Sequence, residues 1–318
     1  MVDSYPGVHT VYVDHDAIQE IYANKSIPFG RVKNLELSFE DKIAFDLPLR
    51  QEIPDWTSYQ NLFVVLTSFA MGEKATAIGR VKGDGIQLIK DFTKAPVFGL
   101  KPRNKEQSML LNSLTDEDVR CQVITGKAGS GKSILALATA LHLLFEREKT
   151  KKDGYEKIIL TRPMEPVGRG LGFLPGTADE KFLPYLSNYF DNIECLMGSN
   201  GRGYLERAVD KGQIEFMPIA LIGGASWHRS IVIADEIQSL TAGECYAIGT
   251  RIAAGSKLIM MGDFKQRYGK LGAVEETGLY RLVNSEVFKR SRITASLTLL
   301  KIERSELAKV FDDAFPEL

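Results

Sequence analysis

The order of apolar and polar positions divides the 318-residue chain into two parts. In the first hundred residues, short runs rich in β-branched and aromatic residues are separated by turn-like connections. These runs are HTVYVD, NLFVVLTSF, TAIGRV and GIQLIKDF, and the pattern of one segment, Asp16–Ala23, is helical. This order predicts a small β-rich module of the type β-α-β-β-β over residues 1–97.

After a connector that contains proline and glycine, KAPVFGLKPRNKEQ, the pattern changes to alternating strands and helices. The strands predicted are CQVIT, KIILT, IEFMPIAL, SIVIADE, KLIMMGD and ASLTLLK. The helices predicted are Glu106–Ser113, Ile134–Arg147, Glu180–Phe190, Gly243–Arg251 and Arg304–Phe315. Short strands that alternate with helices are typical of a mostly parallel sheet covered by helices on both faces. We therefore expect residues 98–318 to form one α/β domain.

Composition narrows the class of protein. Hydrophobic residues make up 44% and charged residues 25% of the chain, as in an ordinary soluble globular protein. The formal net charge is -1, so a nucleic-acid contact would need a local basic patch. The widely spaced cysteines Cys121, Cys195 and Cys245 fit reduced thiols better than a disulfide framework or a zinc site. With neither a secretory signal nor a membrane-spanning stretch in the sequence, we expect a cytoplasmic protein.

A glycine-rich loop supplies the first chemical signal. The segment GKAGSGKS matches G-x-x-x-x-G-K-[ST] in full, follows the strand CQVIT and opens the apolar helix ILALATALHLLF. Glycines let backbone N–H groups and the helix N-terminus point at a phosphate. Lys132 would place a positive charge between the β- and γ-phosphates, and the Ser133 hydroxyl would ligate magnesium. The predicted nucleotide-binding residues of this loop are Gly126, Lys127, Ala128, Gly129, Ser130, Gly131, Lys132 and Ser133.

A second element complements this loop. The strand SIVIADE ends in two carboxylates, of which Asp235 would hold the magnesium ion. Glu236 would orient or deprotonate the attacking water. Many strands end in a solvated acid, but combined with the phosphate loop this pair favours hydrolysis over nucleotide binding alone.

Several stretches, in this order, resemble the PhoH-like ATPases, which are relatives of the superfamily 1 helicases. They are FGLKPRNKEQ, ITGKAGSGKSILALA, KIILTRP, GFLPGTADEK, IVIADEIQSLT, TRIAAGSKLIMMGDFKQ and LTLLKIERSELA. GFLPG and TRIAAGSK are specific to that family, whereas the phosphate loop and DEIQ are shared with helicases generally. The resemblance implies a single RecA-like P-loop core that uses ATP and Mg²⁺.

The resemblance also implies roles for individual polar residues. Gln107 would read the adenine edge, and Gln238 and Gln266 would sense the γ-phosphate and the water. Asp263 would support that network from the end of a neighbouring strand. The alternative for a lone glutamine is an ordinary surface position.

The same resemblance makes Arg304 the candidate arginine finger, with Arg251 as the weaker candidate and Arg162 as a further basic residue to consider. A finger of this kind normally comes from a second core. We therefore expect Arg304 to act across the interface of a ring-shaped homo-oligomer, with a hexamer as the candidate size. The alternative is a solvated arginine at the start of a helix.

The chain also departs from the family pattern. Many members carry Arg-Gly-Arg before the Asp-Glu strand, where this chain has Ile222–Ala225. Longer relatives begin with a PIN-type ribonuclease domain, which this chain lacks, so we expect no ribonuclease activity. The first hundred residues resemble the β-rich spacer that follows that domain.

The function that fits these features is an ATPase that acts on RNA or single-stranded DNA as an oligomer, with no membrane partner. The loop Val167–Phe173, with Arg169 and Phe173, is either a contact for such a strand or a buried structural loop. A P-loop kinase and an ATPase with a protein target remain alternatives. A GTPase is rejected because NKEQ precedes the phosphate loop instead of following a late strand.

Overall fold

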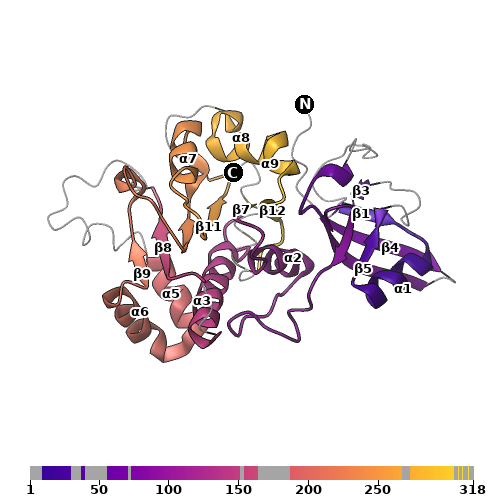
Figure 1. Ribbon diagram of the computed structural model, residues 1–318, viewed down its shortest axis with the longest axis horizontal. Helices are drawn as coiled ribbons and strands as arrows, with labels where there is room; N and C mark the ends of the chain where they lie inside the picture. Colours follow the sequence, from indigo (N-terminus) through magenta and orange to yellow (C-terminus); the bar gives the residue numbers. More distant parts are fainter. Residues whose placement is uncertain are drawn as a thin grey trace.

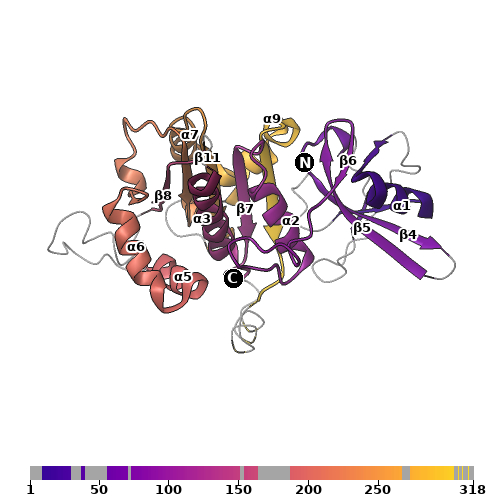
Figure 2. The same ribbon diagram turned by 60° about the horizontal axis from the view of Figure 1, so that its bottom comes forward.

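The computed structural model describes residues 9–29, 37–39, 56–70, 73–150, 154–163, 187–266 and 273–303, together with residues 307, 310 and 314. Within these residues the strands form two six-stranded sheets. Figures 1 and 2 show the two sheets side by side, each with helices of its own. The predicted change from a β-rich part to an α/β part is confirmed.

The N-terminal sheet has the strand order β2-β6-β5-β4-β1-β3, and its described pairs are antiparallel except for the parallel pair of β1 and β4. Asp14 caps α1 by accepting a hydrogen bond from the backbone N–H of Ala17 at 2.8 Å. The predicted order of strands and helix is correct, but the short strands β2 and β3 were not predicted. The elements are β1 (His9–Tyr12), α1 (His15–Asn24), β2 (Ser26–Pro28), β3 (Leu37–Phe39), β4 (Phe63–Ala70), β5 (Glu73–Lys82) and β6 (Gly85–Leu88).

The second sheet has the order β12-β7-β11-β10-β8-β9, and all of its described pairs are parallel. Every residue of β10 and β11 is buried, as expected for central strands covered on both faces. Because the strands are parallel, their carboxyl ends meet at one edge of the sheet. The strands are β7 (Cys121–Gly126), β8 (Lys157–Thr161), β9 (Ile214–Phe216), β10 (Ser230–Ala234), β11 (Lys257–Gly262) and β12 (Thr294–Leu299).

Helices cover both faces of this sheet, and two hydrophobic clusters lie between them and the strands. Alternate residues of one strand enter different clusters, so that Ile231 and Ile233 face one side and Val232 the other. The first face is covered by α2 (Lys105–Leu114), α3 (Lys132–Thr150), α5 (Ser187–Met197) and α6 (Gly201–Asp210). The second is covered by α7 (Ala242–Gly249), α8 (Gly278–Asn284) and α9 (Glu286–Arg290). The predicted α/β architecture is confirmed.

Three sequence predictions need correction or lie beyond the described residues. The run IEFMPIAL is a strand only to Phe216, because Pro218 has no N–H for the ladder, and a short 3-10 helix, Ile219–Leu221, follows. Residues 180–186 lie outside the described part, so the helix predicted for Glu180–Phe190 is seen as Ser187–Met197. The helix predicted for Arg304–Phe315 is described only at residues 307, 310 and 314. In the described part of the chain, no helix combines the length and apolarity needed to cross a membrane.

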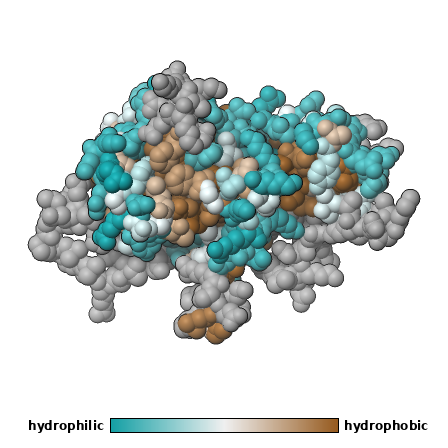
Figure 3. All heavy atoms as spheres, turned by 90° about the horizontal axis from the view of Figure 1, so that it is seen from below, coloured by the Kyte–Doolittle hydropathy of each residue, from teal (hydrophilic) through white to brown (hydrophobic). Residues whose placement is uncertain are grey.

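The two sheets share a small apolar core. Phe63 and Val65 of β4 pack with Met109 of α2, and Leu297 of β12 lies against the same cluster. Seen from below, hydrophobic surface is visible in each of the two sheet-containing halves (Figure 3). Met109, which is fully buried, belongs to a core that both halves share. The division into two domains between residues 97 and 98 stays a prediction.

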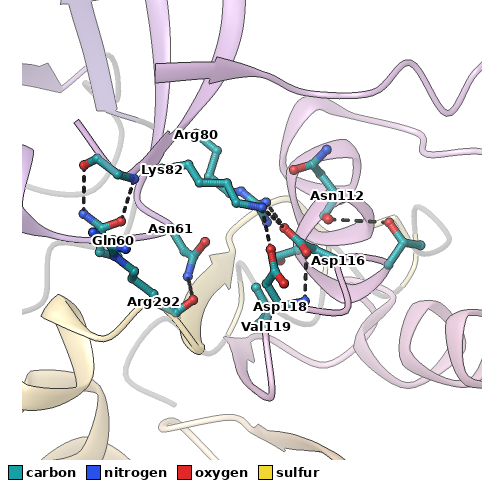
Figure 4. Close-up of polar contacts among 12 residues, drawn as sticks. Gln60, Asn61, Arg80, Lys82, Asn112, Asp116, Asp118, Val119 and Arg292 are labelled. Atoms are coloured by element: carbon teal, nitrogen blue, oxygen red, sulfur yellow. Dashed lines mark hydrogen bonds and ion pairs between the residues drawn. The ribbon is translucent and has the colours of Figure 1, made fainter. Parts of the chain in front are cut away.

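Polar contacts also join the N-terminal sheet to the α/β part (Figure 4). The Arg80 guanidinium of β5 donates to the Asp116 carboxylate, which lies just after α2. The amide of Asn61 donates to the carbonyl oxygens of Arg292 and Thr294, at 3.0 and 2.9 Å. The N-terminal sheet is therefore joined both to the end of α2 and to the start of the edge strand β12.

Candidate nucleotide-binding site

The glycine-rich loop joins the carboxyl end of β7 to the start of α3. Gly126, Gly129 and Gly131 have φ angles of 143°, 82° and 95°, a region that side chains other than glycine rarely adopt. A Cβ atom at Gly126 would also collide with the carbonyl oxygen of Leu299 at the end of β12. The loop thus has the curled backbone at a helix N-terminus that accommodates an anion.

Lys132 lies over this curl. Its Nζ donates to the carbonyl oxygens of Gly126 at 2.5 Å and Lys127 at 3.0 Å, which places the ammonium group inside the loop. Ser130 is fully buried, and its Oγ has no hydrogen-bond partner among the described residues. A positive charge and an unused hydroxyl in one backbone curl fit a polyphosphate.

Asp235 follows β10 and reaches the other side of the loop. Its Oδ2 accepts hydrogen bonds from Ser133 Oγ at 3.2 Å and from the hydroxyl of Tyr189 at 3.0 Å. Burial and the neighbouring Glu236 carboxylate raise the pKa of Asp235 above its ordinary value. Burial and the Asp235 charge raise the pKa of the Tyr189 hydroxyl well above its ordinary value, which keeps it a proton donor. No sequence motif predicts this contact of Tyr189.

A hydroxyl and a carboxylate side by side are the hard oxygen donors that Mg²⁺ prefers. Among the described residues no cluster of three or more His, Cys, Asp or Glu side chains is arranged to hold a metal ion. Magnesium in nucleotide sites is typically held by one or two protein ligands together with phosphate oxygens and water. Ser133 and Asp235 therefore fit a magnesium ion that arrives with a nucleotide.

A hydrogen-bonded chain connects the ends of β10 and β11. Glu236 adopts a left-handed backbone with φ of 56°, and its Oε2 accepts from the Gln238 amide at 2.8 Å. The same amide donates to the backbone carbonyl of Gln266 at 2.7 Å. The Gln238 oxygen accepts from the backbone N–H of Asp263 at 3.3 Å, and the Asp263 carboxylate accepts from the N–H of Ala128 at 3.1 Å. The network returns to the phosphate loop.

Gln107, predicted to read the adenine, and Gln266, predicted to sense the γ-phosphate, differ in their contacts. Gln107 is 5% exposed, donates to the carbonyl of Ser130 at 3.0 Å and accepts from the N–H of Arg103 at 2.9 Å. These two contacts use one N–H and one lone pair of its side-chain amide, which has a second N–H and a second lone pair. Gln266 joins the network through its backbone, while its side chain is exposed. Sensing of the γ-phosphate by the Gln266 side chain stays a prediction.

The basic candidates are distributed differently. Arg304 and the loop Val167–Phe173 lie outside the described residues. Arg162 directly follows β8, and its positive charge acts against the rise in the pKa of Asp235. The backbone of Arg251 accepts from the N–H of Trp227, which precedes β10, so it lies at the sheet edge opposite to the loop. The structure therefore brings Arg162 toward the carboxylates and not the backbone of Arg251.

The parallel sheet, the glycine loop at the start of α3 and the Asp-Glu pair beside it define a P-loop nucleoside-triphosphatase fold. The sequence profile of the family described as PhoH-like protein matches residues 99–316. The chain belongs to this family.

Relatives with this family name cover most of the chain. Protein PhoH2 of Bacillus subtilis (strain 168) is 32% identical over 314 residues, 98% of this chain and 64% of that protein. Protein PhoH2 of Mycolicibacterium smegmatis is 34% identical over 250 residues, 78% of this chain and 54% of that protein. The chain thus spans just over half to nearly two-thirds of the length of these relatives. Among solved structures, the Pif1 helicase from Candida albicans matches 69% of this chain and 44% of its own, with a TM-score of 0.34 and 18% identity.

Proposed function

We propose that the protein is a magnesium-dependent ATPase. The observation that carries this proposal is the contact between Ser133 and Asp235, which are 102 positions apart in the chain. It joins the end of the phosphate loop to the strand end that carries Glu236. Phosphate-binding groups, metal ligands and a carboxylate base thereby meet at one edge of the sheet.

In the proposed mechanism, the curled backbone of the loop and Lys132 bind the β- and γ-phosphates. Magnesium, when bound, neutralises charge on the phosphate oxygens. Glu236 accepts a proton from water as the water oxygen bonds to the γ-phosphorus, and the bond to the β–γ bridging oxygen breaks. The hydrogen bond from the Gln238 amide to Glu236 holds the carboxylate in place for this step.

The remaining roles are part of the same proposal. Gln107 reads the adenine base while it holds Ser130. The side chain of Gln266 senses the γ-phosphate, and Arg304 completes the site from a neighbouring subunit of a homo-oligomeric ring. The thiols of Cys121, Cys195 and Cys245 are unbridged, which supports a cytoplasmic location.

For the target we propose RNA or single-stranded DNA. The Glu236 carboxylate, which the Gln238 amide holds and whose charge raises the pKa of Asp235, supports hydrolysis over transfer to an acceptor such as a kinase substrate, because a carboxylate can accept a proton from water. An ATPase with a protein target is the alternative. ATPase rates measured with and without each nucleic acid decide between them, because only a strand-dependent enzyme is stimulated.

Two variants test the hydrolase proposal. Lys132→Ala removes a cation from a polyphosphate site, so both ATP binding and hydrolysis should be lost. Glu236→Gln keeps the phosphate and metal contacts but removes the base, so ATP should bind and remain uncleaved. Phosphate release and binding of a fluorescent ATP analogue are the measurements. Near wild-type turnover in the Lys132 variant would contradict the proposal.

A further inference from the structure

Glu106 lies next to Gln107 in the first turn of α2 and has no role in the proposed mechanism. Glu106 is only 8% exposed, although glutamate is seldom buried without partners. Its Oε2 accepts hydrogen bonds from the backbone N–H groups of Leu300 at 2.8 Å and Lys301 at 3.2 Å. One carboxylate oxygen thus holds two consecutive amides just beyond the end of β12.

The chain held by Glu106 contacts the phosphate loop at two points. Leu299 pairs in register with Gly126, and its carbonyl oxygen occupies the space that a Cβ of Gly126 would need. Farther along, the N–H of Glu303 donates to the carbonyl oxygen of Gly129 at 3.1 Å. Residues 299–303 therefore border the loop at its first glycine and at its fourth position.

The N-cap residue Asn104 and the first turn of α2 complete this arrangement. Asn104 donates from its side-chain amide to the Glu303 carboxylate at 2.9 Å, and Gln107 donates to the carbonyl of Ser130 at 3.0 Å. Residues on one helical turn thus hold residues 300–303 and the phosphate loop at the same time. Removing the contact of Glu106 would release the segment from its central attachment.

We propose that Glu106 is a positioning residue of the nucleotide site, which sets the shape of the phosphate loop by fixing residues 300 and 301 beside it. This inference rests on the proposed function in that the loop binds a nucleoside triphosphate. It differs from an electrostatic role, because a buried anion near a polyphosphate would by charge alone weaken binding. Positioning and charge therefore predict opposite effects of removing the carboxylate.

The test compares Glu106→Ala, Glu106→Gln and the control Glu117→Ala, which changes an exposed acid beyond the other end of α2. The dissociation constant for a fluorescent ATP analogue is measured for each protein. Loss of both hydrogen bonds in Glu106→Ala should raise this constant at least about tenfold. Glu106→Gln keeps an amide oxygen as acceptor and should restore most of the affinity, and Glu117→Ala should match the wild type. Tighter binding by both Glu106 variants would overturn the proposal in favour of a charge effect.

Hydrogen exchange distinguishes a local effect on the phosphate loop from a general loss of stability. In Glu106→Ala, exchange should accelerate in residues 126–131 and 299–303, while the N-terminal sheet keeps its wild-type protection. Uniform acceleration throughout the chain would reduce Glu106 to a structural residue and refute positioning. If Glu106→Ala fails to fold, hydrogen exchange of the wild-type protein still tests the proposal. Bound nucleotide should slow exchange of the amides of Leu300, Lys301 and Glu303, and unchanged exchange rates would overturn the proposal.

The two proposals fail in different ways. If the wild-type protein binds no nucleotide, the proposed function fails. If the wild type binds, Lys132→Ala does not, and Glu106→Ala binds like the wild type, only the inference about Glu106 fails.

Discussion

Removal of the Asp116 carboxylate should destabilise the protein more than any surface charge change. Arg80 is 3% exposed, and its Nε and Nη1 atoms have no hydrogen-bond partner among the described residues. Asp116 accepts from the remaining guanidinium nitrogen, as Figure 4 shows. Arginine keeps its proton in proteins, so Asp116→Ala leaves a buried charge without its counter-ion.

The burial of the ion pair and the pKa of Asp116 both set the size of the expected loss of stability. Breaking a buried ion pair by removing one partner costs about 3–5 kcal/mol, and the 16% exposure of the Asp116 side chain favours the lower end. Burial opposes ionisation of Asp116, but the N–H of Asp118 and the Arg80 charge lower its pKa from 3.8 to about 2. After allowance for the partial exposure of Asp116, that shift corresponds to about 2 kcal/mol of stability, which is present above about pH 4 and lost as the pH falls through about 2. We therefore expect a loss of about 3 kcal/mol at pH 7.

The assay is urea unfolding followed by tryptophan fluorescence, because the sequence has one tryptophan in each part, Trp56 and Trp227. Variants with Trp56→Phe or Trp227→Phe then report each part separately. The matched control is Lys82→Met, since Lys82 contacts the same Asp116 at 3.2 Å but is 40% exposed. Exposed pairs contribute about 0–1 kcal/mol, so this control should unfold near the wild-type midpoint.

The double variant Arg80→Met with Asp116→Ala separates the pair from the loss of packing. Without the buried charge it should be more stable than Asp116→Ala alone. The reasoning is refuted if Asp116→Ala loses no more stability than Lys82→Met, or if the double variant is less stable than the single one. Because the interface joins both sheets, the two tryptophans should report the same shift, and a shift at only one of them would count against a shared core.

Two further predictions concern the nucleotide site. Gln107→Ala should reduce the preference for ATP over GTP, because the adenine base loses paired hydrogen bonds. The measurement is the ratio of the two dissociation constants, and an unchanged ratio would exclude base reading by Gln107. Arg304→Ala should bind ATP but hydrolyse it roughly three to five powers of ten more slowly. If Arg304 acts across a subunit interface, mixing this variant with Glu236→Gln should restore part of the activity. Mixed oligomers that are verified by mass and show no recovery would rule out action in trans.

The sequence was sufficient where the determinants are local. The strand, the glycines and the apolar helix around Gly126–Ser133 specify their conformation within a few residues, and the structure shows the same order. The parallel sheet could likewise be predicted, because buried strands such as SIVIA are continuous apolar runs. The apolar run IEFMPIAL predicts a longer strand than the structure has, because apolar residues continue beyond Pro218 into the 3-10 helix.

Pairings between distant segments could not be predicted in this way. Tyr189 has the pattern of a buried aromatic residue on an amphipathic helix, and only the fold brings its hydroxyl to Asp235. Glu106 has the pattern of a first-turn acid, which is common at helix N-termini because it complements the helix dipole. Its partners are backbone amides 194 and 195 positions away, and a backbone amide leaves no mark in the sequence.

The same two elements that hold the phosphate loop also carry the N-terminal sheet. The first turn of α2 contacts the loop, while Met109 and the segment after the helix contact β4 and β5. The end of β12 borders Gly126, while its start accepts the amide of Asn61. A ten-residue helix is about 15 Å long and a six-residue strand about 20 Å, so each element extends from the interface to the loop without a break. The N-terminal sheet therefore contacts, at or beyond their far ends, the two elements whose near ends border the phosphate loop.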